Sequence, residues 1–479
     1  MIIQNPKKII ILAISLFFYI APVSSQMLIS SPKNTMIHVP GDQPTIQAGI
    51  DAAITGDTVL VASGTYYENI DFNGKNIVVA SHYALAKDLG FIGSTIINGS
   101  EALNADTASC VRIVSGEGPT AVLQGFTIKG GTGTHWVDPQ SPNYIWHSGG
   151  GVFTFQSSPT IKNNYLIHNH CDGNTGADGS SGGGICLFGG SPLVINNVIK
   201  YNTAQYGAGV VIDYANCELK NNIVAQNSCG NLFGGGGIWA IGDGTETIII
   251  ENNTIVDNES ETRGGAMFIW TAQLITRNNI IWGNTQYYDN QIFLYSGGVV
   301  ELEYTDIEGD IFGIGLIDVI PEFADTTYIL ASGSPCIDVG NPEEIYNDIE
   351  VQENTGQALW PSQGQLRNDM GAYGGPLACA LYDFTTGIIN MPIKFQEISV
   401  EVYPNPFYGK ANIEVTSPDY NEEIRLLLYD IYGNPIDVKF EGKMSDHKKN
   451  FRLININKGT YVLKIISRNS IVHKKILSL

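Results

Sequence analysis

The chain has 479 residues, of which 43% are hydrophobic, 10% aromatic and only 15% charged. This length accommodates two or three domains, and the low charged fraction excludes an acidic disordered chain or a coiled coil. The formal net charge is −21 with no basic patch, so nucleic acid is not an expected partner. The 54 glycines follow no G-x-y period, which excludes collagen, and seven cysteines are too few for a disulfide scaffold.

The N-terminus predicts export. Residues 1–26 begin with two lysines, continue with an apolar stretch from Ile9 to Ile20, and finish on small residues before Gln26. This order is typical of a secretory signal peptide, which is removed from the mature protein. The apolar run is shorter than the ~20 residues needed to span a membrane, and no later stretch is apolar for long enough. We therefore expect no transmembrane segment in the mature chain.

The middle of the chain is a repeat array. Each repeat has a Gly run, a short strand, a turn, a second strand, two asparagines, a third short strand and a final asparagine. The β-branched and aromatic runs of each repeat predict strands, and none is long enough for a helix. The five clearest repeats are residues 149–169, 182–202, 207–227, 235–258 and 264–284.

Stacking the repeats produces columns of similar residues. One column is aliphatic throughout, a second is aliphatic with one exception, and both are predicted to face inward. Polar residues largely alternate with the second column and are predicted to face water. This period of two within a repeat of ~25 residues is what a parallel β-solenoid requires. The inward columns are Leu166, Ile199, Val224, Ile255 and Ile281, and Ile161, Val194, Leu219, Ile250 and Thr276.

Asparagine forms three further columns. Asparagine tolerates the left-handed backbone of a sharp corner, and its amide both donates and accepts hydrogen bonds along a stack. We interpret all three columns as corner ladders rather than as a row of ligand-binding amides. The columns are Asn163, Asn196, Asn221, Asn252 and Asn278; Asn164, Asn197, Asn222, Asn253 and Asn279; and Asn169, Asn202, Asn227, Asn258 and Asn284.

These repeats resemble the right-handed parallel β-helices of the pectate-lyase-like superfamily, and the handedness is implied by that resemblance. Weaker coils extend both ways, with single strands expected at Thr58–Ala62 and Ala121–Ile128, among others. Residues 37–70 resemble the N-terminal cap of the superfamily, with an amphipathic helix at about 45–54. The helix would cover the open edge of the first coil.

The resemblance also divides the rest of the chain. We expect the β-helix over 27–310, followed by a C-terminal cap segment over 311–390. Within that segment, residues 328–376 resemble the stretch that follows many exported bacterial β-helices. Its cysteines Cys336 and Cys379 are a candidate disulfide, whereas Cys171 and Cys229 lie two coils apart in one column, too far to bridge.

Composition changes near residues 390–400. Residues 27–398 carry 12 basic and 38 acidic residues, whereas 399–479 carry 12 basic and 9 acidic residues. From 398 onward, short alternating strands predict a small β-sandwich. The motifs YPNPF (403–407), LYDIYG (428–433) and KGTYVLK (458–464) resemble the C-terminal sorting domain of the bacterial type IX secretion system. The resemblance implies export by that machinery to the cell surface or the medium of a Gram-negative bacterium.

No complete active site emerges from the sequence. A uronate lyase needs Ca²⁺ and a base, and a glycoside hydrolase needs converging carboxylates. The remaining catalytic candidates are His168, His170 and Asp172 near one corner and Asp213 on a neighbouring strand. Asp338 and Asp369 are candidate metal ligands, although such residues more often form turns. We expect no cofactor, and Ca²⁺ enters only under the alternative that the protein is a lyase.

Aromatic residues give the stronger functional signal. Two columns after the Gly run are predicted to point outward, and rings at ~4.8 Å steps can stack sugar rings. The alternative is that a loop covers the strip, since strands buried on both faces are apolar throughout. The candidate glycan-binding residues are Phe153, Phe188, Trp239, Phe268 and Trp270 on the strands, with Trp136 and Trp146 from the loop 130–148.

We therefore predict an all-β protein, a right-handed parallel β-helix followed by a small β-sandwich over 398–479. We expect it to be exported and to bind extracellular polysaccharide. Two alternatives stay open: a polysaccharide lyase or hydrolase whose site is assembled from scattered loops, and an adhesin in which the solenoid is a spacer.

Overall fold

The computed structural model describes residues 34–139, 142–171, 179–288, 291–309, 312–352, 354–381, 399–408, 410–416, 423–430, 435–443, 448–454, 456–467 and 471–479. The expected signal peptide, residues 1–26, lies outside the described residues. In the part of the chain that is described, no helix has the length and apolar character needed to cross a membrane.

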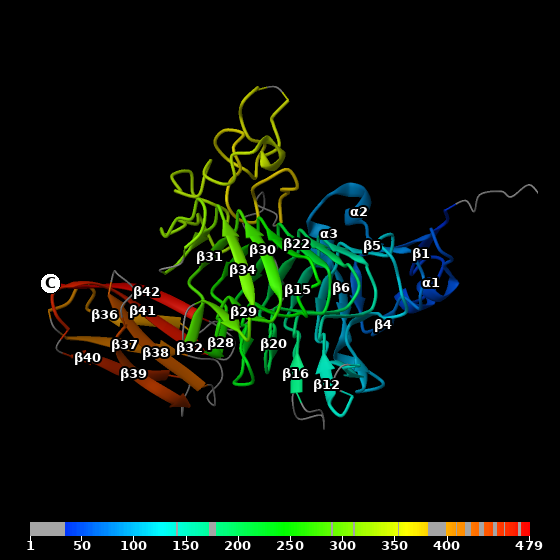
Figure 1. Ribbon diagram of the computed structural model, residues 1–479. Coiled ribbons are helices and arrows are strands. Elements are labelled where there is room, and N and C mark those ends of the chain that lie inside the picture. Colours follow the sequence, from blue (N-terminus) through cyan, green and yellow to red (C-terminus); the bar gives the residue numbers. More distant parts are fainter. Residues whose placement is uncertain are drawn as a thin grey trace, which may run out of the picture. The chain divides into compact units, whose positions relative to one another are not determined.

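Three parallel sheets run along the solenoid (Figure 1), and from β4 onward each coil passes through sheets C, A and B in turn. Sheet A contains β1 (Met36–Val39), β2 (Thr58–Val61), β5 (Val78–Ser81), β9 (Val122–Gln124), β14 (Thr160–Lys162), β18 (Leu193–Ile195), β22 (Cys217–Lys220), β26 (Ile248–Glu251), β30 (Gln273–Arg277) and β34 (Val299–Glu303). Sheet B contains β3 (Gly64–Tyr66), β6 (Thr95–Asn98), β10 (Thr127–Lys129), β15 (Tyr165–Ile167), β19 (Val198–Lys200), β23 (Ile223–Ala225), β27 (Thr254–Val256), β31 (Ile280–Trp282) and β35 (Asp306–Ile307). Sheet C contains β4 (Ile70–Asp71), β8 (Val111–Ile113), β13 (Val152–Phe155), β17 (Ile185–Phe188), β21 (Val210–Asp213), β25 (Ile238–Ile241), β29 (Met267–Trp270) and β33 (Ile292–Tyr295).

Two smaller sheets lie where the coils turn from sheet B back to sheet C. One is parallel and contains β20 (Thr203–Ala204), β24 (Ser228–Cys229), β28 (Glu259–Arg263) and β32 (Thr285–Tyr288). The other is mixed and contains β7 (Thr107–Ala108), β11 (Gly133–Val137), β12 (Ile145–Ser148) and β16 (Gly179–Ser181). Strands β11 and β12 form an antiparallel hairpin that pairs Trp136 with Trp146.

The two aliphatic columns face the interior as predicted, and all ten of their side chains are fully buried. Their strands pair in the register that the repeats indicated, for example Leu166 opposite Ile199 and Ile161 opposite Val194. The interior is one continuous apolar core that reaches from Val39 to Ile307. Period-two alternation therefore determined which face of each strand is buried.

The N-terminal end is covered by a short helix, α1 (Ile46–Ala52). Thr45 caps it, because its hydroxyl accepts a hydrogen bond from the Ala48 N–H (3.1 Å). Ile46, Ile50 and Ala53 are buried against the first coils, as the amphipathic pattern predicted. Two further short helices, α2 (Tyr83–Ala86) and α3 (Gly90–Ser94), follow strand β5.

The single strand predicted over Ala121–Ile128 is wrong, because a corner divides it into β9 and β10. Gly125 turns this corner with a φ of +86°, a left-handed conformation. A Cβ at this position would lie 2.5 Å from Ser81 Oγ, so only glycine fits. In the later coils the equivalent corner residue is an asparagine, beginning with Asn163 (φ +53°).

Only two of the three asparagine columns are ladders. In the column of Asn164 and in that of Asn169, every side-chain amide except that of the last residue donates to the amide oxygen of the next coil; the Asn197–Asn222 bond is 3.0 Å. These residues are buried, and none of them has a left-handed backbone. The column of Asn163 does the reverse: all five residues are left-handed, and their side chains turn outward. The prediction that one residue serves both as corner and as ladder is therefore wrong.

The outward asparagines bind a returning segment, residues 321–381, which we call the strap. The Asn278 carbonyl accepts a hydrogen bond from the Gly371 N–H (2.8 Å), and Asn221 Nδ2 donates to the Gly374 carbonyl (2.7 Å). Asn163 Nδ2 donates to Cys379 Sγ (3.6 Å). The segment that we expected as a C-terminal cap thus runs back along the side of the solenoid, over the outer face of sheet B.

The strap contains no disulfide. All seven cysteines are free, including the candidate pair Cys336 and Cys379. Cys336 instead donates to Asp306 Oδ2 (3.2 Å), while Cys379 lies several coils away beside Asn163.

The C-terminal domain contains two antiparallel sheets with their own apolar core. One sheet contains β36 (Ser399–Tyr403), β37 (Lys410–Thr416) and β40 (Lys448–Ile454), and the other contains β39 (Pro435–Lys443), β38 (Glu423–Asp430), β41 (Gly459–Ser467) and β42 (Ile471–Ser478). The short alternating strands predicted from residue 398 onward are thus confirmed.

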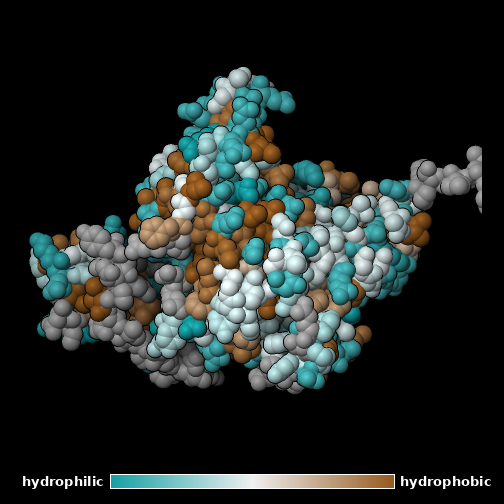
Figure 2. Space-filling view, in the orientation of Figure 1, coloured by the Kyte–Doolittle hydropathy of each residue, from teal (hydrophilic) through white to brown (hydrophobic). Residues whose placement is uncertain are grey.

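The outer face of sheet A mixes charges with apolar residues. Lys220 lies between Glu218 (2.8 Å) and Glu251 (3.8 Å), and Arg277 Nε lies 3.7 Å from Glu251. Figure 2 shows brown patches on this side, over the strands labelled β22, β30 and β34 in Figure 1, among teal and white residues.

Candidate functional site

The outer face of sheet C carries an aromatic layer, which we call the aromatic shell. Its side chains point away from the solenoid interior and pack against one another as a separate cluster. Its buried members are Trp136, Phe153, Cys186, Phe188, Tyr206, Val211, Trp239 and Phe268.

Loops cover most of this shell. Trp136, from the hairpin β11–β12, lies 4.7 Å from Phe188 between ring centroids. Tyr206 lies edge-on to Trp239 at 4.9 Å, and Phe233 lies 6.3 Å from the same indole. Five of the seven candidate glycan-binding residues are therefore buried, and only Trp146 and Trp270 are partly exposed. Most of the aromatic strip is thus covered, as in the alternative in which a loop lies over it.

The shell opens at its C-terminal end into an aromatic hollow of about 310 Å³. Trp270 stands edge-on to Tyr295 (5.1 Å, 89°) and lies 5.5 Å from Phe233. Tyr288 and Tyr295 expose 55% and 43% of their surface, so aromatic rings are accessible here. The lining residues are Asn231, Phe233, Thr262, Arg263, Phe268, Trp270, Tyr288 and Tyr295.

Polar groups stand beside these rings. The guanidinium of Arg263 lies 4.6 Å from the ring centroid of Phe293 and 5.9 Å from that of Tyr288. Thr262 Oγ1 donates to the Phe233 carbonyl (2.8 Å), which fixes the loop that carries Phe233. Sequence reasoning found Phe268 and Trp270 but missed the rest of the hollow. Those residues come from other columns and loops and share no repeat position that would have marked them.

Asp213 lies within the shell, at the end of β21 between Phe188 and Ile241 of the neighbouring coils. Its side chain is buried, and Oδ1 has no hydrogen-bond partner among the described residues. Burial raises the pKa of Asp213 well above its ordinary value, and the carboxylates of Asp138 and Glu246 raise it further. Burial therefore favours the neutral form of this carboxyl group over its charged form.

The histidine candidates lie on another face. His168 occupies a left-handed corner after β15 (φ +53°), and its ring stacks on Tyr201 of the next coil at 5.0 Å. Burial lowers the pKa of His168 to about 4, with Lys129 and Lys200 adding to the effect. His170 Nδ1 is hydrogen-bonded to Thr203 Oγ1. Asp172 lies outside the described residues, and Asp213 belongs to sheet C, so the structure does not assemble these candidates into one site.

Asp338 and Asp369 meet in the strap, where a third residue, Asp348, joins them. Asp369 accepts hydrogen bonds from the N–H groups of Asp338 (2.8 Å) and Gln363 (2.7 Å). Asp348 accepts from the N–H groups of Asp369 and Gly375. Burial raises the pKa of both Asp369 and Asp348, and the Asp369 carboxylate raises that of Asp348 further. Because these oxygens face backbone donors, the arrangement suits a turn better than a metal.

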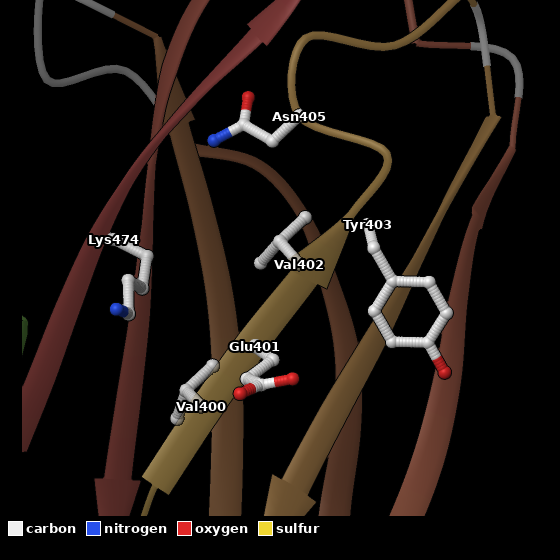
Figure 3. Close-up of a pocket in the computed structure, with 6 residues that line it drawn as sticks. All are labelled: Val400, Glu401, Val402, Tyr403, Asn405 and Lys474. Carbon is white, nitrogen blue, oxygen red and sulfur yellow. The ribbon is translucent and has the colours of Figure 1, made fainter.

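The C-terminal domain has a shallow hollow of about 290 Å³ between β36 and β42, shown in Figure 3. It is lined by Val400, Glu401, Val402, Tyr403, Asn405 and Lys474. Asn405 Nδ2 donates to the Lys475 carbonyl (3.0 Å), and Asn405 Oδ1 accepts from the Leu477 N–H (2.9 Å). Through Asn405, the YPNPF motif therefore holds the backbone of the final strand β42, which gives this asparagine a structural role.

Comparison with known proteins agrees with this architecture. Residues 91–279 match a family model described as a right-handed beta helix region, and residues 401–478 match one described as a secretion system C-terminal sorting domain. The fold and these matches define an exported right-handed parallel β-helix protein. These matches identify a right-handed β-helix region and a C-terminal sorting domain, and the sorting domain marks the chain for type IX secretion to the cell surface or exterior of a Gram-negative bacterium.

A search of curated proteins finds no match. Among solved structures, the chain is similar to the one titled "Crystal structure of pectate lyase Pel9A", with 13% sequence identity and a TM-score of 0.34. That similarity covers 71% of this chain and 96% of the other.

Proposed function

We propose that this exported protein binds extracellular glycan through the aromatic hollow at the C-terminal end of sheet C. The observation that carries the proposal is the set of partly exposed rings of Trp270, Tyr288 and Tyr295 around one concave space. Sugar rings present C–H faces that stack on aromatic rings, while their hydroxyls need donors and acceptors nearby. Arg263 and Asn231 supply such groups at the same hollow.

The buried part of the shell supports this site by holding it rigid. Phe233 packs on both the buried Trp239 and the partly exposed Trp270. The accessible indole of Trp270 is therefore held in place by the covered part of the shell. A side chain that is already ordered loses less entropy when it binds. The covered aromatics thus serve as the support of the site rather than as its contact surface.

Charge favours a neutral ligand. The region 27–398 carries 38 acidic against 12 basic residues, so its field repels a polyuronate unless cations bridge the two. Arg263 is the one cationic residue among those that line the hollow. We therefore expect a neutral polysaccharide to bind better than a uronic one.

Replacement of Trp270 by alanine is expected to weaken binding about fivefold, since a stacked ring contributes on the order of 1 kcal/mol. Retention in affinity gels that contain neutral or uronic polysaccharides, with and without Ca²⁺, measures this effect. Trp360→Ala is the matched control, because Trp360 is half exposed but lies in the strap. Equal retention of the Trp270 and Trp360 variants, with at least one glycan bound, would exclude the hollow as the site.

A second candidate function, glycoside hydrolysis, rests on Asp213. A general acid in a glycosidase is a carboxyl group whose pKa is raised so that it holds its proton. On this hypothesis Asp213→Asn abolishes the release of reducing ends but preserves retention, while His168→Ala changes neither. Because the pKa of Asp213 is raised, turnover should fall as the pH rises through that pKa. The absence of reducing ends or unsaturated uronates across the glycan panel would remove this candidate.

A further inference from the structure

Phe233 divides the rings of the aromatic shell into a covered row and an open group. On one side it lies 6.3 Å from the buried indole of Trp239, and on the other 5.5 Å from Trp270, which lines the hollow. Tyr206 is edge-on to Phe233 at 5.3 Å and edge-on to Trp146 of the hairpin β11–β12 at 5.9 Å. Phe233 is thus the last ring of a continuous cover, and it forms a wall at the end of the hollow nearer the middle of the solenoid.

The opposite end of the hollow is open. Tyr295 belongs to β33, the edge strand of sheet C, and no described strand pairs with the free edge of β33. Arg263 and Tyr288, which are partners in β28 and β32, line the hollow from the neighbouring sheet. A glycan chain that follows the rings from Trp270 to Tyr295 would therefore continue past β33 into solvent. In the other direction it would meet Phe233.

The wall is held in an unusual backbone conformation. Phe233 lies in the loop between β24 and β25 with a φ of +72°, a left-handed conformation that is an outlier for a bulky side chain. The hydrogen bond from Thr262 Oγ1 holds its carbonyl, and at the next residue, Gly234 (φ +133°), a Cβ would lie 2.1 Å from the Arg263 carbonyl oxygen. Strain of this kind persists only where the surrounding structure fixes it, and it is concentrated at functional sites. The backbone therefore supports a functional role for this ring.

Trp239 shows what the wall covers. Its side chain exposes only 4% of its surface, and within the described part of the chain its Nε1 has no hydrogen-bond partner. Trp239 pairs in register with Phe268 of the next coil, and Phe268 lines the hollow. A buried donor without a partner is unfavourable, and a sugar hydroxyl over this indole would satisfy it. Without Phe233, the row of rings would therefore offer one more position for a sugar.

We propose that Phe233 makes the hollow a site for the ends of neutral polysaccharide chains. The terminal sugars stack on the open rings and the chain leaves past β33, whereas an internal segment that follows the rings is excluded because it would have to cross Phe233. This inference rests on the proposed function, since it names the part of the glycan that the same hollow takes. Phe233 is then a residue that determines specificity.

Inhibition of retention by soluble glycan tests for recognition of chain ends. The probe is the neutral polysaccharide of the affinity-gel panel that retains the full-length protein, added either whole or cut by limited acid hydrolysis. Fragments about tenfold shorter carry about tenfold more ends per gram, so half-inhibition should need about tenfold less mass. Equal inhibition per gram by whole and cut polysaccharide would overturn this inference and leave the proposed function intact. Absence of any retention that depends on Trp270 would overturn both.

Phe233→Gly removes the wall without adding strain, since glycine readily adopts a positive φ. We expect whole and cut polysaccharide to inhibit this variant equally per gram, because the row of rings then continues to Trp239. Phe155→Ala is the matched control: it removes a partly buried ring of the shell on β13, away from the hollow, and should keep the preference for fragments. Thermal unfolding checks that both variants are folded, and the result for the unaltered protein depends on neither. A preference for fragments that survives in Phe233→Gly would contradict the role of the wall.

Discussion

Deletion of residues 398–479 is expected to abolish delivery to the cell surface while the β-helix still folds. The sorting domain has its own apolar core, around Phe407, Leu428 and Leu463, and the core of the solenoid ends at Ile307. The excess of acidic residues also ends near this boundary. Because no core residue is shared, the truncated protein should accumulate in the periplasm with its thermal unfolding preserved.

Cell fractionation and protease treatment of intact cells measure this outcome. The variant Asn405→Ala provides a milder comparison, because it removes only the clamp on the backbone of β42. We expect reduced display from this variant and none from the deletion. Normal display of the deleted protein would contradict the role of the sorting domain.

Replacement of Asn222 by leucine is expected to give the largest loss of stability of any single change considered for the solenoid. Asn222 Nδ2 donates to the Val194 carbonyl (2.9 Å) and to Asn253 Oδ1 (3.0 Å), and Asn222 Oδ1 accepts from the N–H and side-chain amide of Asn197. Leucine would remove all four hydrogen bonds. Asn197 Nδ2 would keep the Ile161 and Ile195 carbonyls, and Asn253 Oδ1 would keep the backbone N–H of residue 222. The Asn197 N–H and the Val194 carbonyl would lose the bonds given above, and each buried group left unsatisfied costs about 1–3 kcal/mol. We therefore expect a loss on the order of 5 kcal/mol in the free energy of unfolding, measured by chemical denaturation.

Asn279→Leu is the matched control near the end of the same column. Asn279 accepts from Asn253, but on its other side the backbone meets Thr305 Oγ1 (3.3 Å) instead of another amide. The Asn279 side chain makes as many hydrogen bonds as that of Asn222, but one of them goes to the Arg277 carbonyl of its own coil rather than to another ladder amide. The variant therefore shortens the ladder at its end instead of interrupting it in the middle, so the loss should be smaller. Equal losses at the two sites would argue against a continuous amide ladder.

The sequence by itself determined the solenoid. Each coil contacts mainly the next coil, so the pairing of Leu166 with Ile199, or of Asn197 with Asn222, joins positions that a repeat alignment already places together. Alternation with a period of two then decides which side chains are buried. The sorting domain could also be predicted from the sequence, because its motifs follow one another in fixed order over residues 401–478.

Only the tertiary structure decided what lies outside the solenoid. The outward turn of Asn252 is tied to its bond with Asn368, which is 116 residues away and belongs to no repeat. The cover over Trp239 comes from loops of irregular length, so the exposure of the aromatic strip could not be predicted from its columns. The hollow around Trp270 likewise combines residues from separate coils and loops. A periodic sequence encodes contacts between neighbouring repeats, whereas contacts between distant, non-periodic segments are set by how the chain folds back on the finished solenoid.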